Sequence, residues 1–205
     1  MKRIAALFAV AAMLFSACSE AEPLSVEEAL KDSVIGDANA PVTLIEYSSL
    51  ACPHCANFHV NTLPEIKKNY IDTGKVKMIV RDFPIGGPAY VAAMMARCVK
   101  PERRTKFVDA LFANQETWTK ASNPKAALAR IGKLGGLSQE DFDRCTNDKA
   151  LFEGIQKLQL EAQTKYDVNA TPTFIVMSSK NSDVEKISGA QPYDVFKQAF
   201  DKALQ

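Results

Sequence analysis

The sequence lacks several features that mark whole classes of protein. Its 205 residues carry a formal net charge of +1 and no basic run, so a nucleic-acid-binding surface is not indicated. It contains no internal repeat and no low-complexity tract. Its one long uncharged apolar run, over residues 4–15, has 12 residues and is too short to cross a bilayer. What remains is long enough for one sizeable core, or for one domain that carries an insertion.

Residues 1–21 have the pattern of a secretory signal peptide. A basic start at 1–3 precedes the apolar run, as in exported proteins. Cys18, in Phe15-Ser-Ala-Cys18, resembles the acylated cysteine of a bacterial lipoprotein, whereas ordinary cleavage after Ala21 would remove it. We weigh these two alternatives evenly. Either one predicts a periplasmic protein, soluble or lipid-anchored through Cys18, in a compartment where disulfides persist.

The most informative motif is Cys52-Pro53-His54-Cys55. Its two thiols lie within one helical turn, which is close enough for a disulfide. Pro53 suits the first position of a helix, and the apolar run 42–47 is typical of a buried strand. At such a corner the helix N-terminus favours a thiolate on Cys52, and a protonatable His54 adds to this effect. We predict a redox-active pair in which Cys52 attacks and Cys55 is the buried resolving thiol.

A metal site is the competing use of these residues. Three ligands packed into four residues rarely form a closed tetrahedral zinc site without a remote partner. The only other histidine is His59, which we expect on the surface. We therefore predict no metal and no cofactor. An envelope copper or zinc carrier, and a scaffold whose cysteines only staple a peptide-binding surface, remain as lower-ranked alternatives.

Strand and helix patterns predict an α/β protein with a long helical block. A helix interrupted at Pro64 and a strand at 75–80 follow the first strand, so the two strands should pair in parallel. A possible hairpin at 173–177 and 184–187 and a last helix at 193–204 end the chain. Helical spacing fills the region between. Its expected helices are Ala89–Val99, Glu102–Thr117, Pro124–Leu134, Ser138–Cys145 and Leu151–Tyr166.

Taken together, these features resemble the DsbA-type thiol:disulfide oxidoreductases, especially alphaproteobacterial forms. The resemblance rests on Tyr-Ser-Ser-Leu-Ala-Cys-Pro-His-Cys at 47–55, on Thr171-Pro172 before a late strand, and on the strand order. It implies a thioredoxin-like fold with an inserted all-helical domain. The expected divisions are a lead-in at 22–40, the two halves of the thioredoxin-like domain at 41–86 and 166–205, and the helical insertion at 87–165.

The resemblance also assigns roles to residues outside the cysteine motif. It places Glu46 beneath the disulfide, where the acid helps proton movement at the buried thiol; the alternative is a strand-end carboxylate that faces water. It makes Pro172 a cis-proline that faces the disulfide, and it lets the Thr171 backbone pair with substrate peptide. We favour a structural disulfide between Cys98 and Cys145, which would stabilise the fold by roughly 4 kcal/mol in the chain-entropy model. Two free buried thiols are the alternative.

The expected function is that of a periplasmic dithiol oxidase. Its Cys52–Cys55 disulfide would pass to reduced, unfolded secreted proteins through a mixed disulfide on Cys52. By resemblance, a DsbB-like quinone-linked membrane oxidase would reoxidise the protein, which we expect to be a monomer that binds no nucleic acid. An isomerase or reductase of the same fold is the first alternative. Against it, only some twenty residues precede the first strand after the signal, which leaves no room for the dimerisation domain of DsbC-like isomerases.

Overall fold

The computed structural model describes residues 24–205, and the predicted signal peptide with Cys18 lies outside the described residues. In the described part, the strands form a single five-stranded sheet in the order β1-β3-β2-β4-β5. The strands are β1 (Val34–Ile35), β2 (Val42–Ser48), β3 (Val76–Asp82), β4 (Thr173–Ser178) and β5 (Val184–Ser188).

The pairing of these strands follows the predicted order. Strands β2 and β3 are parallel, with Val42 opposite Val76, and a helical crossover connects them. Strand β4 runs antiparallel to both β2 and β5, which confirms the predicted hairpin. The two-residue strand β1 pairs antiparallel with β3 and was not predicted, because two residues are too few to show a strand period.

The cysteine motif begins one helical rod, which contains two π-helical segments. Helix α2 (Pro53–Asn57) leads into the π-helical segment η1 (Phe58–Thr62), and α3 (Leu63–Ile66) leads into a second, η2 (Lys67–Ile71). Pro64 lies in the first turn of α3, where a residue without an N–H group is tolerated. The predicted interruption therefore takes the form of π-helical turns on both sides rather than a break.

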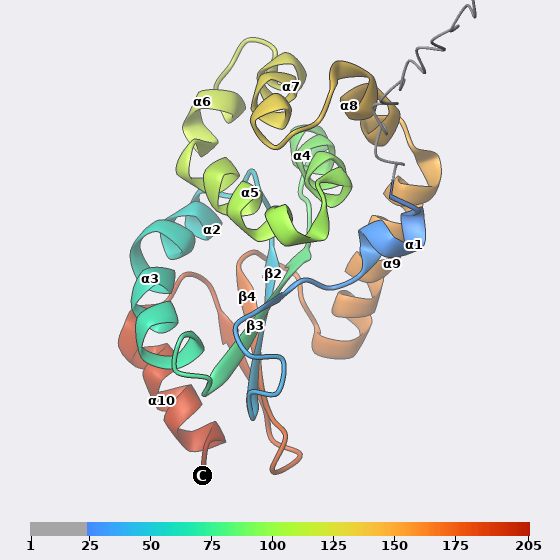
Figure 1. Ribbon diagram of the computed structural model, residues 1–205. Helices are drawn as coiled ribbons and strands as arrows, with labels where there is room; N and C mark the ends of the chain where they lie inside the picture. Colours follow the sequence, from blue (N-terminus) through green and yellow to red (C-terminus); the bar gives the residue numbers. More distant parts are fainter. Residues whose placement is uncertain (1–23) are drawn as a thin grey trace, which may run out of the picture.

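Helices cover the two faces of the sheet unequally. The rod and the last helix, α10 (Tyr193–Ala203), pack on one face, and the C-terminal part of α9 (Lys149–Tyr166) packs on the other (Figure 1). The core under the rod is rich in aromatic rings: Phe58 and Phe174 have ring centroids 4.5 Å apart. This core anchors the rod, and with it the cysteine motif at the rod's N-terminus.

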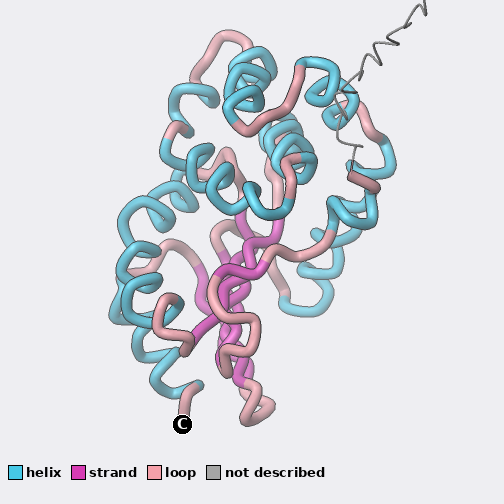
Figure 2. The backbone as a smooth tube through the Cα atoms, viewed as in Figure 1, coloured by secondary structure: helices cyan, strands magenta, loops and turns pink. Residues whose placement is uncertain are grey.

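Between β3 and β4 the chain forms a separate block of helices beyond one end of the sheet (Figures 1 and 2). Trp118 is fully buried in the core of this block. The expected helix Glu102–Thr117 is broken at Asn114, which caps both pieces with a non-helical backbone. The helices of the block are α4 (Gly87–Cys98), α5 (Pro101–Ala113), α6 (Gln115–Thr119), α7 (Pro124–Leu134), α8 (Gln139–Thr146) and α9.

A disulfide joins two helices of this block. Cys98 at the end of α4 and Cys145 in α8 have an S–S distance of 2.06 Å and a Cα–Cα distance of 6.3 Å. The pairing that we favoured from the sequence is therefore present. The crosslink therefore ties two helices of the block to each other.

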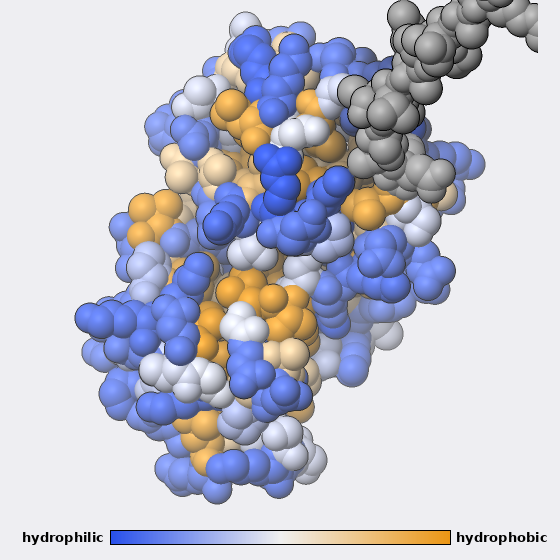
Figure 3. Space-filling model, viewed as in Figure 1, coloured by the Kyte–Doolittle hydropathy of each residue, from blue (hydrophilic) through white to orange (hydrophobic). Residues whose placement is uncertain are grey.

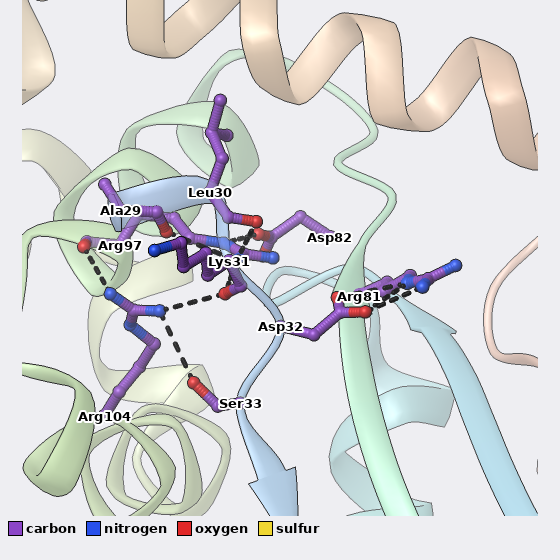
Figure 4. A network of polar contacts seen from close by, with 9 residues as sticks. All are labelled: Ala29, Leu30, Lys31, Asp32, Ser33, Arg81, Asp82, Arg97 and Arg104. Atoms are coloured by element: carbon purple, nitrogen blue, oxygen red, sulfur yellow. Dashed lines mark hydrogen bonds and ion pairs between the residues drawn. The ribbon is translucent and has the colours of Figure 1, made fainter. Parts of the chain in front are cut away.

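The lead-in is tied to both parts of the molecule by two buried arginines (Figure 4). The Arg97 side chain donates to the backbone carbonyls of residues 29–31, at the end of α1 (Val26–Leu30). Its Nε atom is 2.6 Å from Asp82 Oδ2. Arg104 donates to the carbonyls of Lys31 and Arg97 and to Ser33 Oγ. We call Arg97, Arg104 and Asp82 the lead-in clamp. It links the lead-in, β3, α4 and α5 by hydrogen bonds.

The face seen in Figure 3 is largely hydrophilic, and apolar side chains are exposed on it between the helical block and the sheet. None of the helices in residues 24–205 is long and apolar enough to cross a membrane.

Candidate active site

The cysteine motif lies at the corner between β2 and α2. Cys52 is the N-cap, with an extended backbone (φ −83°, ψ 120°), and Pro53 is the first helical residue, as the sequence predicted. Cys55 lies one turn inside the helix and is fully buried, whereas Cys52 is half-buried. Both are free thiols in this structure. The corner thus presents one thiol at the surface and keeps its neighbour inside.

The surroundings of Cys52 favour its thiolate. A hydrogen bond from the Cys55 thiol has the largest effect, and the side chain of Thr171 and the backbone N–H groups of Cys55 and His54 add to it. These contacts outweigh partial burial and lower the pKa of Cys52 to about 5. His54 is exposed, and among the described residues its ring takes part in no hydrogen bond or ion pair. It therefore contributes through its amide at the helix N-terminus.

The surroundings of Cys55 have the opposite effect. Burial is the main cause that raises the pKa of this thiol, and the Cys52 side chain and the negative charge of Glu46 raise it further. The nearby Ser48 side chain opposes these effects only in part. The two thiols of one motif therefore differ strongly in acidity, so a single negative charge shared by the reduced pair resides on Cys52.

Glu46 lies in the sheet directly under the cysteine-bearing helix. Side chains alternate between the faces of a strand, and Glu46 shares the face of Val42 and Leu44, which the helical rod covers. Its carboxylate is fully buried. The Oε2 atom is 2.8 Å from His59 Nε2, and Oε1 has no hydrogen-bond partner. The alternative of a carboxylate that faces water is wrong.

The expectation that His59 lies on the surface is also wrong. Its side chain is 3% exposed and stacks on Phe112 of α5, with ring centroids 4.0 Å apart. Burial lowers the pKa of His59, but the nearby carboxylates of Glu46 and Asp109 outweigh burial and raise it to about 9. The cause of the error is the helical block, because α5 lies against this face of the rod and covers a position that would otherwise face water.

The loop before β4 approaches Cys52 from the other side. The peptide bond between Thr171 and Pro172 is cis, as the resemblance implied. The thiol of Cys52 donates to the Thr171 carbonyl, with Sγ and O 3.4 Å apart. This contact places the Thr171 backbone beside the half-buried sulfur, at the edge where β4 begins.

Two residues of the site were missed from the sequence. Gln115, at the start of α6, donates to the carbonyls of Leu50 (2.7 Å) and Cys52 (2.9 Å) and so binds the helical block to the corner. Asp109 of α5 lies with Oδ1 3.6 Å from His59 Nδ1. Both belong to ordinary amphipathic helix patterns, in which a polar residue near a distant site looks like any other.

A cavity of about 40 Å³ lies between the sheet and the helical block. The polar and charged residues that line it include Ser48, His59, Asp109, Asp82, Arg97 and Arg104. A second, more open groove of about 550 Å³ is lined by His59, Asp109 and Asp72 among others. Within the part of the chain described, no group of three or more His, Cys, Asp or Glu side chains is placed to hold a metal ion.

Comparison with known proteins agrees with this geometry. A family model described as thioredoxin matches residues 28–202. The crystal structure of alpha-DsbA1 from Wolbachia pipientis is 35% identical, with a TM-score of 0.77 over 88% of this chain and 96% of that one. Oxidised BdbD from Bacillus subtilis is 25% identical, with a TM-score of 0.71 over 88% and 95% of the two chains.

A Rickettsia conorii protein named for protein-disulfide oxidoreductase activity is 33% identical over 176 residues, which are 85% of this chain and 61% of that protein. The chain thus spans about three fifths of the length of this relative. The comparisons confirm the fold predicted from the resemblance, a thioredoxin-like α/β sheet with an inserted helical region. The chain therefore belongs to the DsbA-like thiol:disulfide oxidoreductases of the thioredoxin fold.

Proposed function

We propose that the protein is a dithiol oxidase of the bacterial periplasm, which gives its Cys52–Cys55 disulfide to reduced, unfolded secreted proteins. The observation that carries this proposal is the difference in acidity between the two thiols. Because a low pKa keeps Cys52 as a stable thiolate, the reduced pair is favoured over the bridged one. A pair with this preference gives up its disulfide readily, which is the property of an oxidant.

The proposed reaction has two exchange steps. A substrate thiolate attacks Cys52 Sγ, the Cys52–Cys55 bond breaks, and Cys55 leaves with the electron pair. Cys55 then takes up a proton, which passes through Glu46 beneath it. A second substrate thiolate then attacks the substrate sulfur of the mixed disulfide, and Cys52 leaves as a thiolate. The substrate is oxidised by two electrons, and the protein leaves with two reduced cysteines.

The surface around Cys52 supports binding of an extended peptide. The cis Thr171–Pro172 bond lies against the half-buried sulfur, and the start of β4 offers backbone groups there. We propose that this edge pairs with the substrate backbone. Reoxidation would fall to a DsbB-like quinone-linked membrane oxidase, and the predicted signal peptide supports a periplasmic location with or without an anchor at Cys18.

Two measurements on the purified protein test this proposal. The equilibrium reduction potential against glutathione should be well above that of thioredoxin, which is about −270 mV. The oxidised protein should also transfer its disulfide to a reduced, unfolded client. A potential near that of thioredoxin would instead favour the reductase or isomerase alternative.

Two variants separate the roles of the two cysteines in the same assay. Cys52→Ser should abolish transfer, because it removes the attacked sulfur and thus the mixed disulfide. Cys55→Ser should retain attack by Cys52 on an oxidised client and accumulate the mixed disulfide, which is visible as a covalent complex on a non-reducing gel. Transfer that persists in Cys52→Ser would refute the assigned roles.

A further inference from the structure

The proton of the Cys55 thiol has no direct route to solvent. Cys55 is fully buried, and the Glu46 carboxylate below it is fully buried as well. Each opening of the disulfide leaves Cys55 in need of a proton, and each closing releases one. A proton that Glu46 passes to Cys55 or takes from it must itself be exchanged before the next turnover. A path for protons between Glu46 and solvent is therefore needed in addition to the position of Glu46 beneath the thiol.

We propose that His59 and Asp109 carry protons between Glu46 and solvent, as positioning residues that serve the buried Cys55 thiol through Glu46. We call Glu46, His59 and Asp109 the proton relay. This inference rests on the proposed function, because the relay has a role only if the cysteine pair turns over.

The contacts form a continuous line from the sheet to the surface. Glu46 Oε2 is 2.8 Å from His59 Nε2, and His59 Nδ1 is 3.6 Å from Asp109 Oδ1. The Asp109 side chain is 42% exposed, so the last member reaches water. An imidazole ring suits the middle position, because it can take a proton on one nitrogen and release one from the other.

The ring is held for this task by aromatic neighbours. Phe112 stacks on one face of His59, and Phe58 meets it edge to face with ring centroids 5.6 Å apart. These contacts fix the ring plane so that one nitrogen faces β2 and the other faces α5. His59 Nδ1 has no hydrogen-bond partner within the described structure, and neither has Glu46 Oε1. A purely structural ion pair would be expected to use these positions.

The charged groups around His59 agree with a proton-holding role. Glu46 from β2 and Asp109 from α5 are the acids in contact with it, and together they raise its pKa to about 9 against the effect of burial. At neutral pH the ring therefore holds the proton that Cys55 needs. More distant charged groups line the cavity and the outer groove beside the ring: Asp82, Arg97, Arg104, Lys67 and Asp72.

The relay step balances with the first exchange step. When a thiolate bonds to Cys52 Sγ and the Cys52–Cys55 bond breaks, the electron pair goes to Cys55. A proton then passes from His59 to the Glu46 carboxylate and on to Cys55, and His59 is reprotonated from solvent through Asp109. No electrons pass through the relay, and the only net input is one proton from water. Closing the disulfide runs the same path in reverse.

The test is a pH profile for single-turnover reduction of the oxidised protein by glutathione, expressed per glutathione thiolate and followed by alkylation of the free thiols. For His59→Gln, which is close in size and keeps a donor for Glu46, we expect a rate about tenfold or more below wild type at pH 7. The wild-type rate should fall toward that of the variant above pH 9, where His59 loses its proton. The His59→Gln profile should be flat over this range.

Asp109→Asn tests the exit of the relay at a partly exposed position. It should slow the reaction in the same pH range but by a smaller factor, because water can partly replace the lost carboxylate. The matched control is Asp72→Asn, which changes an exposed acid of the same groove that makes no contact with the ring. It should follow the wild-type profile.

Rescue by a small base separates proton transfer from packing. His59→Ala opens space beside the groove, and imidazole added to the buffer should restore part of its lost rate, whereas it should leave His59→Gln unchanged. If His59→Ala does not fold, the profiles of His59→Gln and Asp109→Asn decide alone. Equal profiles for wild type and His59→Gln would overturn the relay, as would a loss in His59→Gln that is uniform in pH while Asp109→Asn matches wild type.

The outcomes also distinguish this inference from the proposed function. If wild-type protein neither exchanges with glutathione nor oxidises a client, the proposed function fails. If wild type reacts and the relay variants react equally well at every pH, the relay alone fails.

Discussion

Two clusters of charged side chains, the lead-in clamp and the proton relay, border the cavity between the sheet and the helical block, and they are built differently. In the lead-in clamp, Arg97 uses its donors on three backbone carbonyls and on the Asp82 carboxylate. In the proton relay, Glu46 Oε1 and His59 Nδ1 have no hydrogen-bond partner within the described structure. The paired donors of Arg97 hold parts of the fold together, although Arg104 Nε of the same clamp has no partner in the described structure. The unpaired atoms of the relay lie on a carboxylate and an imidazole, which can exchange protons.

The sharpest way to break the clamp is Arg97→Met. It leaves the mostly buried Asp82 carboxylate and three carbonyls without their partner, so the free energy of unfolding should fall by about 3–5 kcal/mol. Chemical denaturation measures the loss. The thiolate absorbance of Cys52, titrated on the folded variant, should be unchanged because the clamp does not contact the cysteine motif.

The control for this prediction is an ion pair of the same charge types on the solvent-exposed surface of the protein. Lys149 and Glu153 lie 3.5 Å apart on α9 with both side chains exposed. Lys149→Met should therefore cost no more than about 1 kcal/mol. An equal loss of unfolding free energy in both variants would show that burial does not strengthen the contribution of the clamp to stability.

The sequence predicted local features of the site and not the contacts between distant segments. The strand at 42–48 and the helix start at Pro53 follow from apolar patterning and from the chemistry of the first helical position. His59 could not be placed, because its burial depends on α5, some fifty positions later in the chain. The same holds for Gln115, whose partners lie on a loop that precedes the insertion.

The pH dependence of the unfolding free energy tests the proton relay. The pKa of His59 is raised from 6.5 to about 9 in the folded protein, so folding favours its protonated form. The stabilisation is complete below pH 6.5, declines as the pH rises, and is absent above about pH 9. Its size should be about 3 kcal/mol.

Urea denaturation of the reduced protein between pH 6 and about 9.5 measures this slope. Subtracting the same series for His59→Gln removes the contributions of Cys52 and of other groups common to both proteins. The difference should shrink as the pH rises. A difference that stays constant or grows with pH would mean that folding does not favour the protonated ring.

The smallest effect is expected at Arg104, and it tests whether the clamp depends on charge pairing or on hydrogen bonds alone. Arg104 is buried beside Arg97, and burial followed by the positive charge of Arg97 lowers its pKa to about 10. None of its hydrogen bonds goes to a carboxylate. Arg104→Gln therefore removes a charge that is costly to bury and leaves no opposite charge unpaired, so denaturation should show a loss of only about 1–2 kcal/mol. A loss equal to that of Arg97→Met would mean that the two arginines stabilise the fold through hydrogen bonds to the lead-in carbonyls and not through the ion pair with Asp82.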